Sequence, residues 1–382
     1  MIQKKLKQKN ILLKLIKLLK KKMRKIYLNR LSKLHQNLND NNLDAMYITN
    51  LTNIRYLTGF TGSAGSVLVL PDKQFFITDG RYIEQSKNQV KEFEIIITNE
   101  GHLNTIKKGG FLHKIHSLAF EGQHVSYSQY EAIKNTFSSL KLIKTEMIIE
   151  HLAAIKDKQE IAALKTAVEI TDQVFLDIIP DLKVGAVEKE ISAKISFLFK
   201  KHGADGDAYD PIIASGLYAA LPHARPSKKK FENEDFVVMD FGALYNGYHA
   251  DMTRTVVIGN ATEKHKEIYQ IVLESQLAGI AAAKAGMTGK ELDAICRGVI
   301  KKNGYGDSFI HSTGHGLGLE IHTYPRISQF NNKKLLENYI ITIEPGIYIA
   351  NWGGVRIEDD CLIKKDGCIP FNKSTKEMLV LS

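Results

Sequence analysis

The sequence has no run of about 18 apolar residues, the length that a membrane-spanning helix needs. Its N-terminal apolar stretch, residues 11–19, is interrupted by Lys14 and Lys17, and no small-residue cleavage site follows it. Neither a secretory signal nor stable membrane insertion is therefore expected. We accordingly predict a cytoplasmic protein.

Cysteine is scarce as well. Only Cys296, Cys361 and Cys368 occur, and their spacing is not that of a cysteine metal site. We expect buried or inert thiols in a reducing compartment. The 382 residues, 44% of them hydrophobic, are enough for a sizeable core, and the length predicts two domains.

Acidic residues are absent from residues 1–30, which contain 12 lysines and arginines. Subtracting these 12 charges from the formal net charge of +10 leaves −2 for residues 31–382. The basic excess is thus confined to the N-terminal end, and the nearly neutral remainder argues against a nucleic-acid-binding protein. Residues 1–22 are either a basic amphipathic helix or a solvated, disordered extension.

Turn residues and apolar patterns predict a small α/β domain over residues 23–148 and a second domain over residues 149–382. In the first domain we expect a helix over 27–41 and strands over 43–48, 66–70, 74–78 and 93–98. In the second we expect helices over 158–179, 187–202, 263–285 and 289–303, and strands over 236–240, 248–257, 339–344 and 355–363.

Candidate chemistry lies beside the strands of the second domain. Asp240 ends the apolar run 236–239, and Asp251 follows after the turn 245–247, which would bring the two carboxylates together. Glu344 ends a second apolar run, and Glu358 lies within another. His315 occupies a glycine-rich bend, residues 314–318.

Four carboxylates cannot share one site without mutual repulsion, and a pair of divalent cations would remove it. Carboxylates with one imidazole form a hard ligand set that suits manganese best and also accepts cobalt or zinc. Asp359 and Asp360, next to Glu358, are expected to be solvated or to cap an element.

Six ordered motifs of the second domain resemble the pita-bread metallopeptidases, in the aminopeptidase P and prolidase (Xaa-Pro peptidase) branch. They are LPHARP (221–226), MDFG (239–242), ADMTRT (250–255), HSTGHGLG (311–318), IEPGIY (343–348) and GVRIED (354–359). NIRYLTGFTGS (53–63) resembles that branch's N-terminal domain. The resemblance covers about residues 24–382.

The resemblance implies an α+β protein, in which a creatinase/prolidase-type α/β domain precedes a pita-bread catalytic domain. It also implies a metal centre and a homodimer. Asp240 would hold one ion, His315 and Glu344 the other, and Asp251 and Glu358 would bridge both. Four further residues complete the implied site. His223, His311 and His322 would surround the substrate, and Arg356 would lie beside the ligands.

The implied activity is hydrolysis of the Xaa-Pro bond, in dipeptides or at the N-terminus of longer peptides, by a metal-bridging hydroxide. Glu344 would carry a proton to the leaving nitrogen. The family often has Glu after the histidine at position 322, whereas this chain has Thr323 and Tyr324, so substrate contacts there stay open. The alternative is a catalytically silent pita-bread binding protein that uses the basic N-terminal extension as an anchor.

Overall fold

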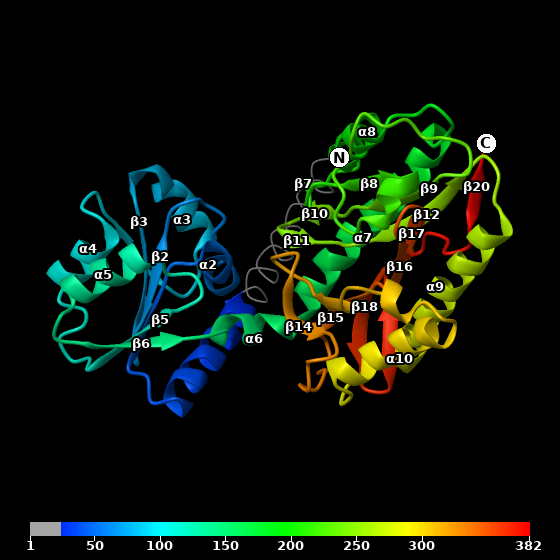
Figure 1. Cartoon of the computed structure of the whole chain (residues 1–382). Coiled ribbons are helices and arrows are strands. Elements are labelled where there is room, and N and C mark those ends of the chain that lie inside the picture. The colour runs from blue at the N-terminus through cyan, green and yellow to red at the C-terminus, as the bar shows by residue number, and fades with distance from the viewer. Residues whose placement is uncertain (1–23) are drawn as a thin grey trace, which may run out of the picture. The chain divides into compact units, whose positions relative to one another are not determined.

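The computed structural model describes residues 24–382, which form two compact units, residues 24–153 and Ala154–Ser382 (Figure 1). The prediction for residues 1–22 lies outside the described residues. Between residues 24 and 382, no helix combines the length and the apolar character needed to cross a membrane.

The N-terminal unit is a mixed six-stranded sheet with helices around it, in the order β4-β3-β2-β1-β5-β6. Its strands are β1 (Ala45–Ile48), β2 (Ser66–Val69), β3 (Gln74–Thr78), β4 (Glu94–Ile97), β5 (Ser117–Glu121) and β6 (Lys141–Thr145). Its helices are residues 24–40, α2 (Leu51–Thr58), α3 (Ile83–Gln89), α4 (His102–Lys108), α5 (Tyr127–Thr136) and α6 (Ile148–Ala154). The first four strands and the first helix confirm their predictions, whereas β5 and β6 were not predicted.

Two helix pairs frame the second unit. The predicted helices are confirmed as α7 (Lys158–Ile178), α8 (Glu188–Lys201), α9 (Glu263–Ala282) and α10 (Gly289–Lys302). Helix α7 begins with a capping box, in which Asp157 accepts from the backbone N–H of Glu160. It ends in a short 3₁₀ turn that contains Pro180, because proline cannot continue the helical hydrogen bonds.

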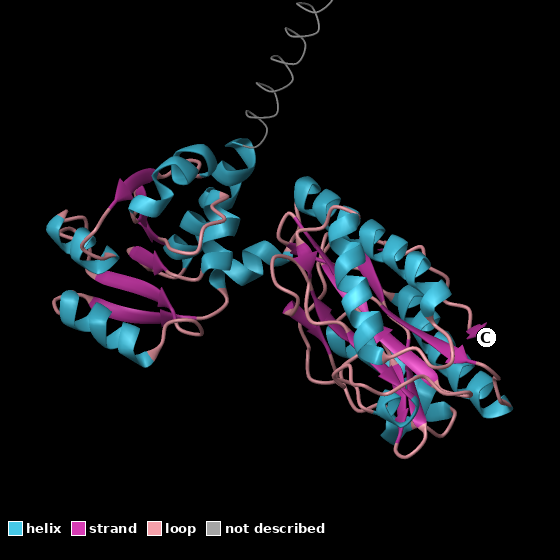
Figure 2. Cartoon of the chain, turned by 90° about the horizontal axis from the view of Figure 1, so that it is seen from above, coloured by secondary structure: helices cyan, strands magenta, loops and turns pink. Residues whose placement is uncertain are grey.

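The strands of this unit form two main sheets, ordered β20-β12-β9-β8 and β14-β13-β15-β18-β19, and two small ones, β11-β10-β7 and β16-β17. The strands are β7 (Gly206–Asp207), β8 (Ile212–Ser215), β9 (Phe236–Asp240), β10 (Ala243–Tyr245), β11 (Tyr248–His249), β12 (Thr253–Ile258), β13 (Gly314–Gly316), β14 (Thr323–Ile327), β15 (Ile340–Ile343), β16 (Gly346–Ile349), β17 (Gly353–Arg356), β18 (Asp359–Lys364), β19 (Gly367–Pro370) and β20 (Leu379–Leu381). Figure 2 shows helices alongside these strands.

Two predicted strands are wrong as single elements. The segment 248–257 is divided into β11 and β12, and 355–363 is divided into β17 and β18. Each break falls next to an acidic residue, Asp251 or Glu358. At the second break the chain passes from one sheet to another, and the Glu358 N–H donates to the Thr253 carbonyl, outside any regular ladder. Because Asp251 and Glu358 lie outside the strands, their side chains are not bound to the alternating directions that a strand imposes.

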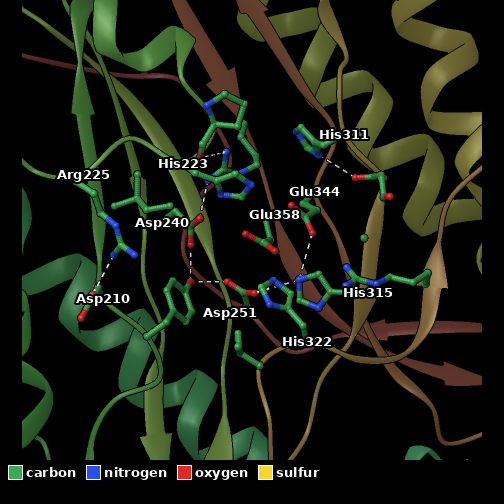
Figure 3. Close-up of a pocket in the computed structure, with 18 residues that line it drawn as sticks. Asp210, His223, Arg225, Asp240, Asp251, His311, His315, His322, Glu344 and Glu358 are labelled. Carbon is green, nitrogen blue, oxygen red and sulfur yellow. Dashed lines mark hydrogen bonds and ion pairs between the residues drawn. The ribbon is translucent and has the colours of Figure 1, made fainter. Parts of the chain in front are cut away.

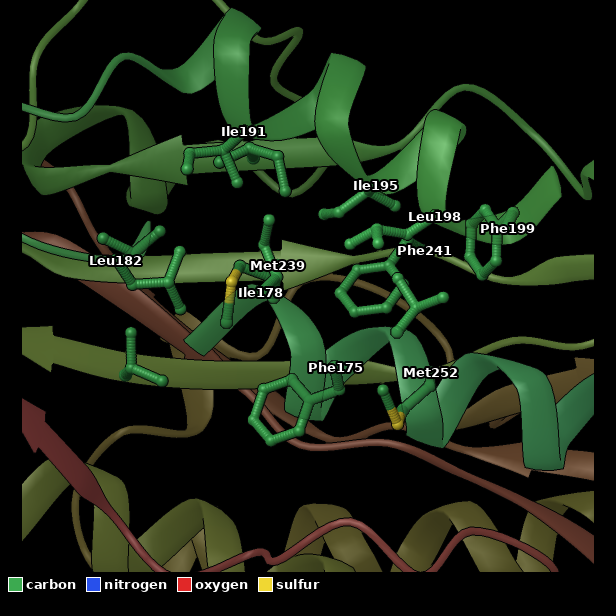
Figure 4. Close-up of a cluster of buried hydrophobic side chains, with 14 of the residues drawn as sticks. Phe175, Ile178, Leu182, Ile191, Ile195, Leu198, Phe199, Met239, Phe241 and Met252 are labelled. Carbon is green, nitrogen blue, oxygen red and sulfur yellow. The ribbon is translucent and has the colours of Figure 1, made fainter. Parts of the chain in front are cut away.

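The largest core cluster lies between α7, α8 and the sheet that contains β9 and β12 (Figure 4). Ile178 and Ile195 of the helices and Met239 of β9 are fully buried there. Each such side chain contributes roughly 1.5–3 kcal/mol by leaving water. A second cluster packs α9 and α10 against β15 and β18. Both helix pairs therefore fix the strands whose ends carry the polar residues described next.

Candidate metal centre

Asp240 and Asp251 are brought together by antiparallel strands. Strand β9 ends at Asp240, which pairs with Thr253 at the start of β12. The intervening chain turns back at Asn246 and Gly247, with φ values of 48° and 75°. Two consecutive positive φ values favour an Asn-Gly pair in a hairpin turn, so the predicted turn is confirmed. Asp251 therefore lies near Asp240 although the two are separated by a hairpin.

The second main sheet supplies the other three residues. His315 is the central residue of β13, Glu344 directly follows β15, and Glu358 directly precedes β18. Strand β15 pairs with both β13 and β18, so these positions are adjacent in space. The Glu344 N–H also donates to the Thr313 carbonyl, which joins the end of β15 to the approach to β13.

The five predicted ligands surround one cavity of about 520 Å³ (Figure 3). The His315 Nε2 lies 3.5 Å from the Asp251 Oδ2 and 3.4 Å from the Glu344 Oε1. One donor atom each of Asp251, His315 and Glu358 lies within 4.8 Å of the other two, as ligands of a common ion would. Thirteen further residues line the cavity, which are Tyr209, Asp210, Ile212, Pro222, His223, Arg225, His311, Ser312, Gly314, Ile321, His322, Arg326 and Arg356.

The carboxylates of this cavity are poorly compensated. Burial raises the pKa of Asp251, Glu344 and Glu358 well above the ordinary range, and repulsion from neighbouring carboxylates raises each further. Arg356 supplies the one guanidinium that pairs with a ligand carboxylate among residues 24–382, at 2.5 Å from Asp240. Four acids beside one guanidinium leave negative charge that the protein itself does not balance.

This donor set fits divalent metal ions. Burial, and then the neighbouring His322, lower the pKa of His315 to about 3, so its imidazole is neutral, as a ligand must be. The His315 Nδ1 lies 3.1 Å from the Gly316 carbonyl, which leaves Nε2 directed at the carboxylates. Buried carboxylate oxygens with one imidazole are hard ligands, and cations would remove the repulsion between them.

Three hydroxyl groups that hold the acids were not among the predicted residues. The Tyr209 hydroxyl is hydrogen-bonded to Asp240 and Asp251. Thr253 donates to Glu358 at 2.7 Å, and Thr342 donates to Glu344 at 3.0 Å. The two threonines stand in the strands beside the ligands and were within reach of a strand-alternation argument, whereas Tyr209 is remote from both acids in sequence and gave no signal.

Arg356 and His311 belong to one hydrogen-bonded chain. Arg356 donates to Asp240 through Nη2 and to the Tyr348 hydroxyl through Nη1, at 2.7 Å. Tyr348 in turn donates to the His311 Nε2 at 2.9 Å, and the His311 Nδ1 lies 2.8 Å from the Ser312 carbonyl. Burial, followed by the charge of Arg356, lowers the pKa of His311 to about 3. Its ring is therefore neutral, and both nitrogens are already engaged.

His223 and His322 differ from His311 in being exposed, although both line the cavity. The His322 ring lies edge-on to His315, at 4.4 Å between centroids. Neither of the two exposed imidazoles has a hydrogen-bond partner within the described part of the chain. Thr323 and Tyr324, where the motif departs from the family, do not line the cavity.

The expectation that Asp359 and Asp360 are solvated is wrong, because both are fully buried. Asp359 forms ion pairs with Arg254 at 2.8 Å and Lys376 at 2.7 Å. Asp360 accepts from the Asp251 N–H at 3.0 Å, so it fixes the backbone of a candidate ligand. Their burial follows from β18, which runs through the interior.

The buried carboxylates and His315 come from two β-sheets and are suited to hold metal ions. Residues 162–365 match metallopeptidase family M24, and residues 30–155 match the creatinase/prolidase N-terminal domain. The chain belongs to family M24, and its second unit has the pita-bread fold.

Similar proteins span almost the whole chain. An Xaa-Pro dipeptidase from Pyrococcus furiosus is 42% identical over 357 residues, which cover 92% of this chain and 99% of that one. An Xaa-Pro dipeptidase structure from Bacillus anthracis has a TM-score of 0.91 at 41% identity, covering 93% of this chain and all of the other. An X-Pro aminopeptidase structure from Thermotoga maritima has a TM-score of 0.83 at 39% identity, covering 88% and 97% of the two chains. The predicted family and fold are confirmed.

Proposed function

We propose that this metallopeptidase binds two divalent ions and hydrolyses the bond before proline. The observation that carries the proposal is the convergence of four carboxylates and one neutral imidazole on a single cavity. The names of the relatives, Xaa-Pro dipeptidase and X-Pro aminopeptidase, supply the substrate class.

Asp240 would hold one ion, His315 and Glu344 the other, and Asp251 and Glu358 would bridge them. Manganese suits this oxygen-rich set, and a net excess of carboxylates over Arg356 favours two ions over one. When bound, the ions would supply a Lewis acid for the scissile carbonyl and lower the pKa of a water molecule.

The proline nitrogen is the tertiary nitrogen of an amide and must gain a proton to leave. Glu344 is suited to deliver it, because its carboxylate borders the cavity beside the other proposed ligands and can pass a proton from the attacking water to that nitrogen. Its Oε1 accepts from the Thr342 hydroxyl, which leaves Oε2 to carry the proton. Thr342 also accepts from the His315 N–H at 3.0 Å and so aligns both side chains.

The substrate carbonyl needs hydrogen-bond donors as it gains negative charge. His223 and His322 are suited to this task, because their rings line the cavity with no other partner in the described residues. His311 is not, because its Nδ1 faces the Ser312 carbonyl and its Nε2 accepts from Tyr348. We therefore assign substrate contact to His223 and His322, and give His311 the task of holding Tyr348.

We further propose a preference for dipeptides. Arg326 lines the cavity, is exposed, and has no ion-pair partner in residues 24–382. A free guanidinium matches the carboxylate of a dipeptide, which lies one residue beyond the cleaved bond. A longer peptide has a neutral amide at that position. Arg225, by contrast, is paired with Asp210 at 3.0 Å.

The test is steady-state hydrolysis by chelator-treated, manganese-reloaded protein. Substrates are an Xaa-Pro dipeptide, an Xaa-Pro-Xaa tripeptide and, as control, an Xaa-Ala dipeptide. We expect cleavage of the two proline peptides only, with the dipeptide preferred. Arg326→Gln should remove that preference by weakening dipeptide binding, while Arg225→Gln, the matched control, should retain it. Metal binding without hydrolysis would favour the silent binding protein instead.

A further inference from the structure

The segment between α10 and β13 carries His311 but has little regular structure apart from a single 3₁₀ turn, η4 (Gly306–Ser308). Irregular backbone near a buried site needs donors for its carbonyl groups, because no strand or helix partner supplies them. Those donors come from one side chain of α10. Arg297 donates through Nη1 to the Phe309 carbonyl at 2.7 Å and through Nη2 to the His311 carbonyl at 2.8 Å.

Asp293 holds this guanidinium from one helical turn earlier. Its Oδ2 accepts from the Arg297 Nε at 2.8 Å, and its Oδ1 accepts from Nη2 at 3.0 Å. The same Oδ1 also accepts from the N–H and the hydroxyl of Thr313, at 3.1 and 2.9 Å. One fully buried carboxylate thus fixes both the arginine and the residue that leads into β13.

Arg297 and Asp293 together bind the backbone before and after residue 312, and so fix the segment that carries His311. Arg297 binds the carbonyls at 309 and 311, Asp293 binds residue 313, and the guanidinium lies 4.1 Å above the centre of the Phe309 ring. The Phe309 ring in turn stands edge-on to His311, at 5.1 Å between centroids. Neither charged residue lines the cavity.

From His311 the contacts continue to the metal centre. Its Nε2 accepts from Tyr348, and Tyr348 accepts from Arg356, which pairs with Asp240. Without the hydrogen bonds from Arg297 and Asp293 to residues 309–313, the His311 ring would no longer be held in place. Tyr348 would then lose the acceptor that orients its hydroxyl. The charged pair on α10 therefore lies at the start of a continuous path to a candidate ligand.

We propose that Asp293 and Arg297 are positioning residues, which act on the reaction through His311 and Tyr348 without touching the substrate. This inference rests on the proposed function for its kinetic readout. A guanidinium fork can serve two carbonyls and a carboxylate in one plane, which a lysine ammonium cannot, so the arginine is required at this position.

The variant that tests this proposal most directly is Arg297→Lys. It keeps the positive charge but lacks the planar guanidinium that binds two carbonyls and a carboxylate. We expect the manganese-loaded variant to retain its metal content and to lose at least tenfold in kcat/KM on an Xaa-Pro dipeptide. The matched control is Ile300→Val, a buried position of the same helix, which weakens packing and leaves the fork intact. It should stay within twofold of the wild-type protein. Should Arg297→Lys fail to fold, Asp293→Asn, which keeps an acceptor for Thr313, takes its place and should show the same loss.

A double-mutant cycle separates positioning from general damage. In a His311→Ala background, Arg297→Lys should cost less than twofold in kcat/KM, because the residue through which it acts is already gone. Equal losses in both backgrounds, or a comparable loss in Ile300→Val, would overturn the proposal.

A second readout does not depend on activity. In ¹⁵N-histidine spectra, the ring signals of His311 are assigned by their absence from His311→Ala. Arg297→Lys should shift them, and Ile300→Val should leave them in place. If the wild-type protein cleaves no Xaa-Pro peptide, the proposed function fails, and these spectra still decide the positioning role. Unshifted His311 signals in Arg297→Lys would refute it.

Discussion

Two neighbouring buried acids, Glu358 and Asp359, belong to regions with opposite electrostatics. Glu358 faces the cavity, and burial together with the charge of Asp251 raises its pKa. Burial would raise the pKa of Asp359 as well, yet Arg254 and Lys376 hold that pKa below its ordinary value. Both side chains are at most 1% exposed, so depth alone does not distinguish them.

Asp359 and Glu358 differ in whether the protein itself supplies positive charge beside the carboxylate. Around Asp359 the protein provides Arg254, Lys376 and the Gln276 amide, the last at 3.1 Å. Around Glu358 it provides the Thr253 hydroxyl and further acids, and the one nearby guanidinium is directed at Asp240. A buried acid with its own cation is part of the scaffold, whereas a buried acid left among other acids is built for a cation from solution.

The largest expected effect comes from the cavity region. Glu358→Gln should lower turnover by more than about 1,000-fold, since loss of contacts around ligands alone costs roughly 10–100-fold and this change removes a ligand. Elemental analysis of the same sample should show fewer than two ions per chain. Two ions per chain in the variant would contradict the assignment of Glu358 as a bridging ligand.

The compensated region should respond in stability. Asp359→Asn leaves the buried Arg254 and the half-buried Lys376 without their acid, so we expect the free energy of unfolding to fall by about 3 kcal/mol. Urea unfolding can be followed through Trp352, the single tryptophan, which packs against Phe236 in the catalytic unit. Metal-free Glu358→Gln is the control and should show no such loss, because it removes one of several mutually repelling charges. An equal loss in both variants would erase the distinction between the regions.

Lys156 is a buried cation, and we expect it to have a smaller effect on stability than the buried acids. Burial lowers its pKa from 10.5 to about 8, so the folded state binds this proton more weakly than the unfolded state. The penalty for burying the ammonium is present below pH 8 and disappears as the pH rises toward 10.5. Relative to Lys156→Met, the wild-type protein should gain about 2 kcal/mol of stability between pH 7 and pH 10. A constant difference across that range would show that the lysine is not desolvated.

The sequence predicted much of this arrangement because its acids stand at the ends of apolar runs. Asp240 ends a strand and Glu344 follows another, and the β-branched residues of both strands are easily recognised. The Asn246-Gly247 turn explains how Asp251 returns toward Asp240. The family motifs supplied the roles of the residues. Helix α7 was predicted from apolar residues at helical spacing, and α8 to α10 were predicted with the help of the glycines near their C-terminal ends.

What the sequence did not predict depends on contacts between distant segments. Asp359 was expected in solvent because its partners, Arg254 and Lys376, lie in other elements and carry no local signal. Tyr209 was overlooked for the same reason. Strand breaks before β12 and β18 were missed because local propensity favours a continuous strand, whereas packing between two sheets decides where it stops.

The division of the ligands between two sheets has a mechanical consequence. Asp240 and Asp251 come from the β9–β12 sheet, and His315, Glu344 and Glu358 come from the sheet that contains β13, β15 and β18. A bridging ion would cross-link the two halves of the catalytic unit and close a long loop of chain. A covalent bridge over a loop of roughly 100 residues is worth about 4.7 kcal/mol in chain entropy. Metal occupancy would then govern how often the unit opens, and so how long it survives a protease.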